Sequence, residues 1–96
     1  MLVDVRVAGQ GPFRFVVDTG AERTVISRQV AERLRLPRGQ DLVLLTISEA
    51  ARVQSVTIPQ LDLGRRTLRE LEAPVVEQAH LGAEGLLGVD ALQTQN

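Results

Sequence analysis

Two short segments with apolar residues at every second position constrain the fold of this chain more than any other feature of its sequence. They cover residues 2–7 and 13–17, and the turn-forming residues Gly-Gln-Gly-Pro lie between them at 9–12. Alternation with a period of two is typical of β-strands that bury one face. The sequence therefore predicts a β-hairpin at its start, with three large apolar side chains on one face of the second strand: Phe13, Phe15 and Val17.

The middle of the chain predicts a short helix followed by a second hairpin. Ser27 is placed to cap a helix over residues 28–35, and Pro37 with Gly39 marks the end of that helix. Residues 42–48 and 52–58 favour β-structure, and the three residues between them form the predicted turn.

The last third of the chain predicts further strands and one more helix. Residues 61–63 predict a short strand, and residues 73–76 predict an edge strand, because Pro74 cannot donate to a sheet ladder. Residues 77–84 predict a polar loop. Residues 85–88 predict a buried strand, and a short helix is expected after it.

Length and composition exclude several classes of function. A chain of 96 residues corresponds to one small domain. Eleven basic and twelve acidic residues give a net charge of −1, so neither nucleic acid nor an anionic membrane is an expected partner. The apolar runs are also far shorter than the roughly 20 residues that span a bilayer.

The residue types that bind metals and cofactors are also scarce. The chain has no Cys and one His, so no thiolate or histidine-rich metal site, and no cofactor, is expected. The absence of Cys leaves the redox state of the compartment open. Four further aspartates are expected at turns and solvent-facing positions, which argues against a carboxylate metal site: Asp4, Asp41, Asp62 and Asp90.

Asp18 is the residue that points most directly to chemistry, because it follows an apolar strand and precedes Thr19 and Gly20. A carboxylate in this position needs hydrogen-bond donors, since burial of an ionised group without partners is costly. Gly20 can turn its amide toward the carboxylate, and Thr19 offers a hydroxyl that can brace the loop. By themselves these residues leave two alternatives, a turn carboxylate that caps backbone amides and a catalytic carboxylate.

A second motif, Leu86-Leu87-Gly88, places two large apolar residues before a glycine. Such a glycine allows close packing against another backbone segment, although an ordinary core strand that ends in a turn has the same pattern. Together with Phe-Val-Val-Asp-Thr-Gly-Ala at residues 15–21, this motif resembles the retroviral-type aspartic proteases, the retropepsins and their bacterial and eukaryotic relatives. The resemblance covers nearly the whole chain and is nearest to bacterial-type members.

The resemblance implies an all-β acid-protease barrel with one or two short helices that assembles as a two-fold homodimer and acts on a polypeptide substrate without a cofactor. Asp18 would be the catalytic residue of an aspartic endopeptidase, and Thr19 would tie two catalytic loops together. Since the chain has one such motif, the water that attacks the peptide bond would be activated by Asp18 from both subunits. The other implied site residues are Gly20 and Ala21 in the loop, Leu86, Leu87 and Gly88 behind it, and a flap at Ile47, Ser48, Glu49, Ala50 and Ala51.

Two departures from the family pattern keep an alternative open. The flap tip has none of the glycines that give such flaps their mobility. Relatives also continue beyond the last helix into a strand that interleaves with the dimer partner, whereas this sequence stops at Asn96. Either the chain is a fragment of a longer protein or it dimerises through other contacts. The alternative function is a catalytically silent dimerisation or peptide-binding module of the same fold.

Overall fold

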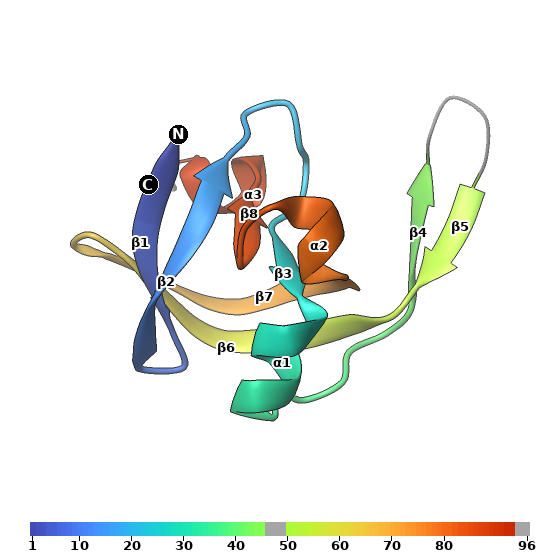
Figure 1. The fold of residues 1–96 in the computed structure, drawn as a ribbon, viewed down its shortest axis with the longest axis horizontal. Helices are drawn as coiled ribbons and strands as arrows, with labels where there is room; N and C mark the ends of the chain where they lie inside the picture. Colours follow the sequence, from blue (N-terminus) through green and yellow to red (C-terminus); the bar gives the residue numbers. More distant parts are fainter. Residues whose placement is uncertain (46–49, 94–96) are drawn as a thin grey trace.

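The computed structural model describes residues 1–45 and 50–93, and most of them form β-strands (Figure 1). Three of the predicted flap residues, Ile47, Ser48 and Glu49, lie outside the described residues. The strands are β1 (Leu2–Val7), β2 (Gln10–Val17), β3 (Val25–Ser27), β4 (Leu42–Leu45), β5 (Ala50–Val53), β6 (Ser55–Leu63), β7 (Arg66–Val76) and β8 (Gly85–Leu87), and the helices are α1 (Arg28–Leu34), α2 (Gln78–Leu81) and α3 (Val89–Leu92).

Six of the strands form a closed barrel in the order β1-β2-β8-β3-β7-β6, and β4 and β5 form a separate two-stranded sheet. Figure 1 shows this small sheet standing away from the barrel, joined to it through β6 and the segment before β4. The predicted all-β barrel is therefore confirmed. The described residues contain three short helices, where the sequence predicted one or two.

The hydrophobic core fills the inside of the barrel, because strands with alternating apolar residues turn one face inward. Phe15 is 0% exposed and Phe13 5% exposed, as the alternation predicted. Val17 is half-buried and packs against the same core. Two buried residues of α1, Val30 and Ala31, also join the core cluster.

The N-terminal hairpin forms as predicted, but its turn lies earlier in the chain. β1 and β2 pair antiparallel from Leu2 opposite Val16. The turn consists of Ala8 and Gly9, which have φ values of 53° and 76°. Two successive residues with positive φ produce the tight two-residue turn that matches the twist of the strands. Gln10, and Gly11 and Pro12 after it, therefore belong to β2.

The second predicted hairpin forms between β4 and β5, with Leu42 opposite Val53. The predicted strand over residues 52–58 is nevertheless divided, because Ser55 begins β6, which pairs with β7. The prediction of a separate short strand over residues 61–63 was wrong, since these residues are the end of β6. Pro59 lies within β6 although it has no amide hydrogen for the ladder. It is exposed, and Glu70, opposite it in register, departs from strand geometry with φ 57°, so the pairing is irregular at this point and continues on both sides of it.

The prediction of an edge strand at residues 73–76 was also wrong. β7 pairs with β6 on one side, and its last residues pair in parallel with β3 on the other. The ladder to β3 begins at Val75, which lies opposite Ile26. Pro74 is accommodated because it lies just before this ladder and needs no amide hydrogen there.

Ser27 caps α1 as predicted, since its Oγ accepts a hydrogen bond from the Val30 amide at 3.1 Å. The predicted end of the helix is also confirmed, because Arg35 is the C-cap residue with left-handed geometry. The predicted loop over residues 77–84 instead contains α2. Its N-cap, Glu77, contacts Arg28 at the start of α1.

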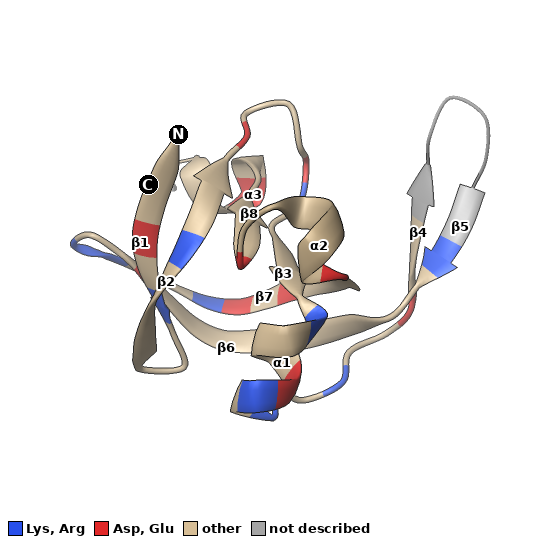
Figure 2. Ribbon diagram, in the orientation of Figure 1, with Lys and Arg blue, Asp and Glu red and all other residues tan. Residues whose placement is uncertain are grey.

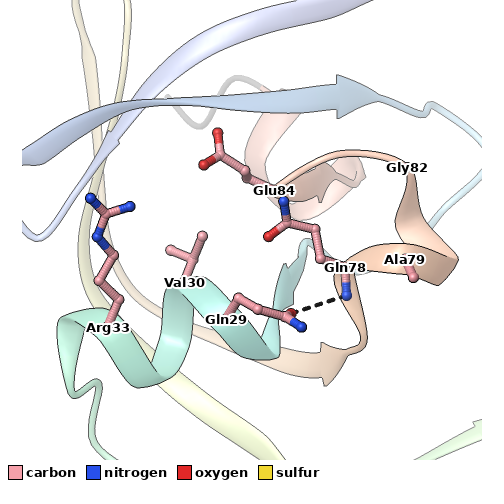
Figure 3. Close-up of a pocket in the computed structure, with 7 residues that line it drawn as sticks. All are labelled: Gln29, Val30, Arg33, Gln78, Ala79, Gly82 and Glu84. Carbon is pink, nitrogen blue, oxygen red and sulfur yellow. Dashed lines mark hydrogen bonds between the residues drawn. The ribbon is translucent and has the colours of Figure 1, made fainter.

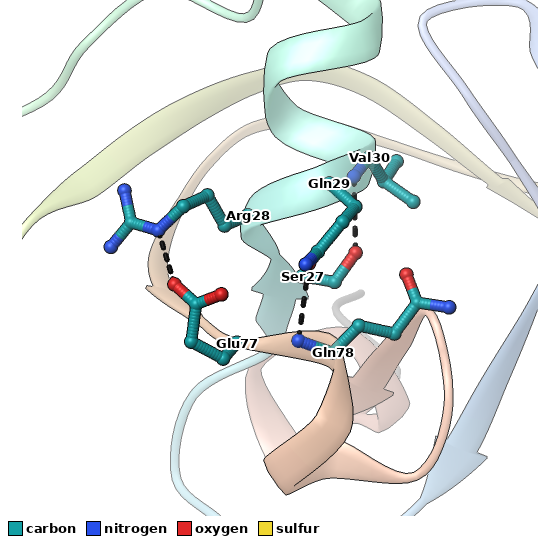
Figure 4. A network of polar contacts seen from close by, with 6 residues as sticks. All are labelled: Ser27, Arg28, Gln29, Val30, Glu77 and Gln78. Carbon is teal, nitrogen blue, oxygen red and sulfur yellow. Dashed lines mark hydrogen bonds and ion pairs between the residues drawn. The ribbon is translucent and has the colours of Figure 1, made fainter.

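Two polar contacts join α1 to α2 (Figure 4). Arg28 Nε donates to Glu77 Oε2 at 2.5 Å, and the Gln78 amide donates to Gln29 Oε1 at 3.1 Å. The hydrogen bond from Arg28 lowers the pKa of Glu77 below its ordinary value of 4.5. A lowered pKa means that this pair stabilises the fold above pH 4.5, and that its contribution disappears as the pH falls through the lower value in the folded state. Both side chains are substantially exposed, so the contribution is small.

Acidic and basic positions are interspersed along the ribbon, as expected for a chain with a net charge of −1 (Figure 2). Within residues 1–45 and 50–93, no helix has the length and apolar character that spanning a bilayer requires. α1 has seven residues and the other two helices have four each.

Candidate functional site

Asp18 lies where β2 leaves the barrel, in a loop held next to the end of β8. β2 and β8 pair in parallel, with Val17 opposite Leu87. The ladder is extended by one further hydrogen bond, from the Asp18 amide to the Leu87 carbonyl oxygen at 3.0 Å. The two sequence motifs are therefore brought together by adjacent strands, and the backbone of Asp18 has a fixed position.

The loop supplies the donor that the Asp18 carboxylate was predicted to need. The Gly20 amide donates to Asp18 Oδ1 at 2.9 Å, and the Ala21 amide donates to the Asp18 carbonyl oxygen at 3.2 Å. Asp18 is half-buried, whereas Thr19 and Gly20 are exposed. The predicted hydrogen bond from Gly20 is confirmed, and the carboxylate lies at the surface of the isolated chain, where a second molecule can reach it.

The segment after β8, Gly88 and the first residues of α3, packs directly on the backbone of the Asp18 loop. The Val89 amide donates to the Ala21 carbonyl oxygen at 2.8 Å, and the Asp90 amide donates to the Glu22 carbonyl oxygen at 3.3 Å. A Cβ atom added to Gly88 would lie 2.5 Å from the carbonyl carbon of Arg23 and 2.9 Å from the Ala21 oxygen. Gly88 therefore permits the close backbone approach predicted from its position after two leucines.

The two leucines before Gly88 occupy different environments. Leu87 is 0% exposed and belongs to the barrel core. Leu86 is half-buried and lies opposite Val16 on one neighbouring strand and Val25 on the other. Leu87 thus anchors the end of β8 in the core, while Leu86 shares a half-buried apolar surface with its two neighbours.

The side-chain contact between Thr24 and Asp90 of α3 was missed from the sequence. The Thr24 amide donates to Asp90 Oδ1 at 2.9 Å and Oδ2 at 3.1 Å, and the Thr24 hydroxyl donates to Oδ1 at 2.7 Å. The same hydroxyl accepts a hydrogen bond from the Gly88 amide at 3.3 Å. Asp90 was expected to face solvent, which was wrong, because it is half-buried against a fully buried threonine.

We expect Asp90→Asn to lower the free energy of unfolding by about 1 kcal/mol, because hydrogen bonds to an ionised acceptor are stronger than those to a neutral one. The asparagine oxygen can still accept from Thr24, but its amide group would face the Thr24 N–H, which is also a donor. Urea denaturation at pH 7 measures the effect. Asp4→Asn, at an exposed position that pairs with Arg14, is the control, and equal stability of the wild type and both variants would contradict this role of Asp90.

A cavity of about 390 Å³ lies beside the Asp18 loop. The loop forms one side of it through residues 20–23, and Val43 of β4 forms another. Val25 and Pro74 add apolar surface, while Glu22 and Arg23 are exposed and charged. The separate β4–β5 sheet therefore contributes a wall to the space next to the candidate carboxylate. Of the predicted flap residues, the backbone of Ala50 and Ala51 belongs to β5.

Another cavity, of about 620 Å³, lies between α1 and α2 (Figure 3). Val30, Arg33 and Glu84 point toward it from different sides. The Glu84 carboxylate has a partner within the chain, since it accepts a hydrogen bond from the Arg14 amide at 2.8 Å. None of residues 18–24 lines this cavity, so it is not part of the candidate site.

The chain is similar to aspartic proteases in both sequence and fold. Residues 3–94 match the sequence profile of a family described as gag-polyprotein putative aspartyl protease. A retropepsin-like aspartic protease from Rickettsia conorii has a similar structure, with a TM-score of 0.66 and 19% sequence identity over 92% of this chain and 66% of that one. The chain thus spans about two thirds of the length of the Rickettsia protein.

A protein of unknown function (DUF785) from Legionella pneumophila also has a similar structure. Its TM-score is 0.58, its sequence identity is 14%, and the match covers 95% of this chain and 82% of that one. No curated protein matches the sequence. At these identities the structural matches show that the fold is shared, and the predicted retropepsin-like fold is confirmed.

Proposed function

Since this chain belongs to the family described as gag-polyprotein putative aspartyl protease, we propose that it is an aspartic endopeptidase that works as a homodimer. Its substrate is a polypeptide held in an extended conformation across the cleft between two barrels. Asp18 is the catalytic residue of each subunit, and Thr19, exposed beside it, links the two catalytic loops across the dimer axis. No metal ion or cofactor takes part.

The observation that carries this proposal is the position of Asp18 on a rigid but exposed loop. Backbone hydrogen bonds to β8 and to the start of α3 hold the main chain of the loop, and the Gly20 amide orients the Asp18 carboxylate. The packing of Leu87 and Gly88 supports this loop from behind. The single donor from Gly20 would also suit a carboxylate that caps a turn, but the bracing of the loop by the start of α3 is the support that a positioned catalytic group requires.

Two copies of Asp18 complete the site, because one carboxylate cannot serve as both base and acid. Two carboxylates close together share one proton, since both cannot easily be ionised. The ionised partner removes a proton from a bound water as the water oxygen attacks the carbonyl carbon, and the protonated partner donates to the carbonyl oxygen. In the second step the partner that is now protonated donates its proton to the leaving nitrogen, and the partner that is now ionised takes a proton from one hydroxyl of the tetrahedral intermediate. The C–N bond then breaks, and the pair again holds one proton. The pair titrates as a unit.

Cleavage of an unfolded protein between about pH 3 and 7, measured over a dilution series of the enzyme, tests the proposal. We expect the cleavage rate per subunit to fall as the enzyme is diluted below its dimer dissociation constant, because the monomer holds half of the site. A rate per subunit that stays constant on dilution to monomer would contradict the shared site. Peptide binding without cleavage at any concentration would instead favour the silent binding module.

A further inference from the structure

The two chain segments at the base of the β4–β5 sheet converge on a single carboxylate, Glu72 of β7. Gly39 and Gln40 lie just before β4, and Ser55 lies just after β5. The Ser55 hydroxyl donates toward the Gln40 carbonyl oxygen and toward Glu72 Oε2, the latter at 3.0 Å. Thr57 Oγ1 lies 3.4 Å from Glu72 Oε1. One side chain therefore contacts the segments that enter and leave the small sheet.

Two backbone hydrogen bonds at the base of the sheet lie beside these side-chain contacts. The Gly39 amide donates to the Ser55 carbonyl oxygen at 3.0 Å, and the Thr57 amide donates to the Pro37 carbonyl oxygen at 2.8 Å. Ser55 is 0% exposed and Glu72 is half-buried. A Cβ atom at Gly39 would lie only 2.8 Å from Glu72 Oε1, so the carboxylate is packed directly against the backbone of the entering segment.

The contacts at the base of the β4–β5 sheet influence its position, because the sheet is separate from the barrel. β4 and β5 pair with each other and are not part of the closed barrel. Val43 of β4 nevertheless forms part of the cavity beside residues 20–23. The position of that wall relative to the Asp18 loop therefore depends on how firmly the base of the sheet is held.

We infer that Glu72 is a positioning residue that fixes the β4–β5 sheet beside the Asp18 loop. Its carboxylate accepts a hydrogen bond from Ser55 in the segment that leaves the sheet and packs against Gly39 in the segment that enters it. This inference rests on the proposed function for its effect on catalysis, because the wall it positions is then part of the substrate cleft. The holding contact itself is a property of the folded chain and can be measured without a substrate.

Substitutions of Glu72 can distinguish whether its hydrogen bond or its negative charge holds the base of the sheet. A serine hydroxyl has one hydrogen, which Ser55 shares between two acceptors, the Gln40 carbonyl and the Glu72 carboxylate. A glutamine at position 72 has the same length and can donate from its amide to Ser55 Oγ, so the Ser55 hydrogen is then free to bind the Gln40 carbonyl. We therefore expect Glu72→Gln to preserve the contact and Glu72→Ala to lose it.

Hydrogen exchange of the Gly39 amide, measured by NMR on the full chain, tests this inference. We expect exchange to be on the order of 3- to 10-fold faster in Glu72→Ala, as for the loss of one hydrogen bond, and unchanged in Glu72→Gln. Gly39→Ala, which displaces the carboxylate, should resemble Glu72→Ala. The Ala8 amide, bonded to the Gln60 carbonyl at 2.8 Å on the far part of β6, is the internal control and should not change.

Three results would overturn the inference: an unchanged Gly39 amide in Glu72→Ala, equal acceleration in Glu72→Gln and Glu72→Ala, or equal acceleration at Ala8. In the cleavage assay, Glu72→Ala should raise KM several-fold with a smaller change in kcat, and Glu72→Gln should restore KM. If the wild type cleaves nothing while the exchange results are as expected, the proposed function fails and the positioning role of Glu72 stands.

Discussion

Replacement of Asp18 by asparagine should reduce kcat by about 10²- to 10⁴-fold, the range that positioned acid–base groups contribute. Asparagine has nearly the same size as aspartate and can still accept the hydrogen bond from the Gly20 amide through its oxygen. It cannot take a proton from water. The fold and the affinity for an uncleaved peptide should therefore be retained, and steady-state kinetics with a fluorogenic peptide would measure the loss.

The same variant also tests whether the two subunits share one site. Excess Asp18→Asn added to the wild type should suppress activity, because most wild-type subunits would then lie in mixed dimers with one aspartate. Asp4→Asn, at an exposed aspartate within β1 that pairs with Arg14, should have no such effect. Undiminished activity in the mixture, with dimers present, would show that each subunit acts alone.

Replacement of Gly88 by alanine should destabilise the fold by about 1–3 kcal/mol, the usual range for overpacking a well-packed site. The new methyl group would lie 2.5 Å from the Arg23 carbonyl carbon and 2.6 Å from the Arg23 oxygen. These are backbone atoms in a loop held by several hydrogen bonds, so they cannot move aside as a flexible side chain would. For a domain of this size, the expected fall in Tm is about 4–8 °C per kcal/mol.

Gly20→Ala is the matched control for Gly88→Ala, because both glycines lie in the paired loops. Its Cβ atom would meet only the Asp18 carboxylate, at 3.3 Å, and that side chain can adjust. We expect a smaller change in Tm for Gly20→Ala than for Gly88→Ala. Equal Tm values for the two variants would mean that the close approach of Gly88 to Arg23 does not limit stability.

The features predicted well from the sequence are those whose signal lies within a few residues. Alternation in residues 2–7 and 13–17 identified the first hairpin and its buried phenylalanines, because the side-chain period of a strand is local. Ser27 identified the start of α1, since a cap bonds an amide only three residues away. The family was recognised from two short motifs, at residues 15–21 and 86–88, and the match of residues 3–94 to the family profile confirms that family.

The features predicted wrongly depend on contacts between distant segments. Pro74 suggested an edge strand, yet β3 pairs with the residues directly after it. Residues 61–63 suggested a separate short strand, yet they are the end of β6, which pairs with β7 along its length. The helix α2 lies in a segment without a clear periodic signal, and contacts from α1 hold it in place. In each case tertiary pairing outweighed the local preference of the residues.

The sequence alone determined that this chain is mainly β-structure with a carboxylate at the end of its second strand, because strand periodicity and the Asp-Thr-Gly motif are local properties, and the barrel was implied by the family resemblance. Only the tertiary structure decided how that carboxylate is supported. Thr24 and Asp90 are 66 residues apart and Ser55 and Glu72 are 17 apart, and nothing in their spacing indicates a contact. These pairs meet because barrel closure brings β8 beside β2 and β3, and β7 beside β6, and the barrel closes to bury its apolar face.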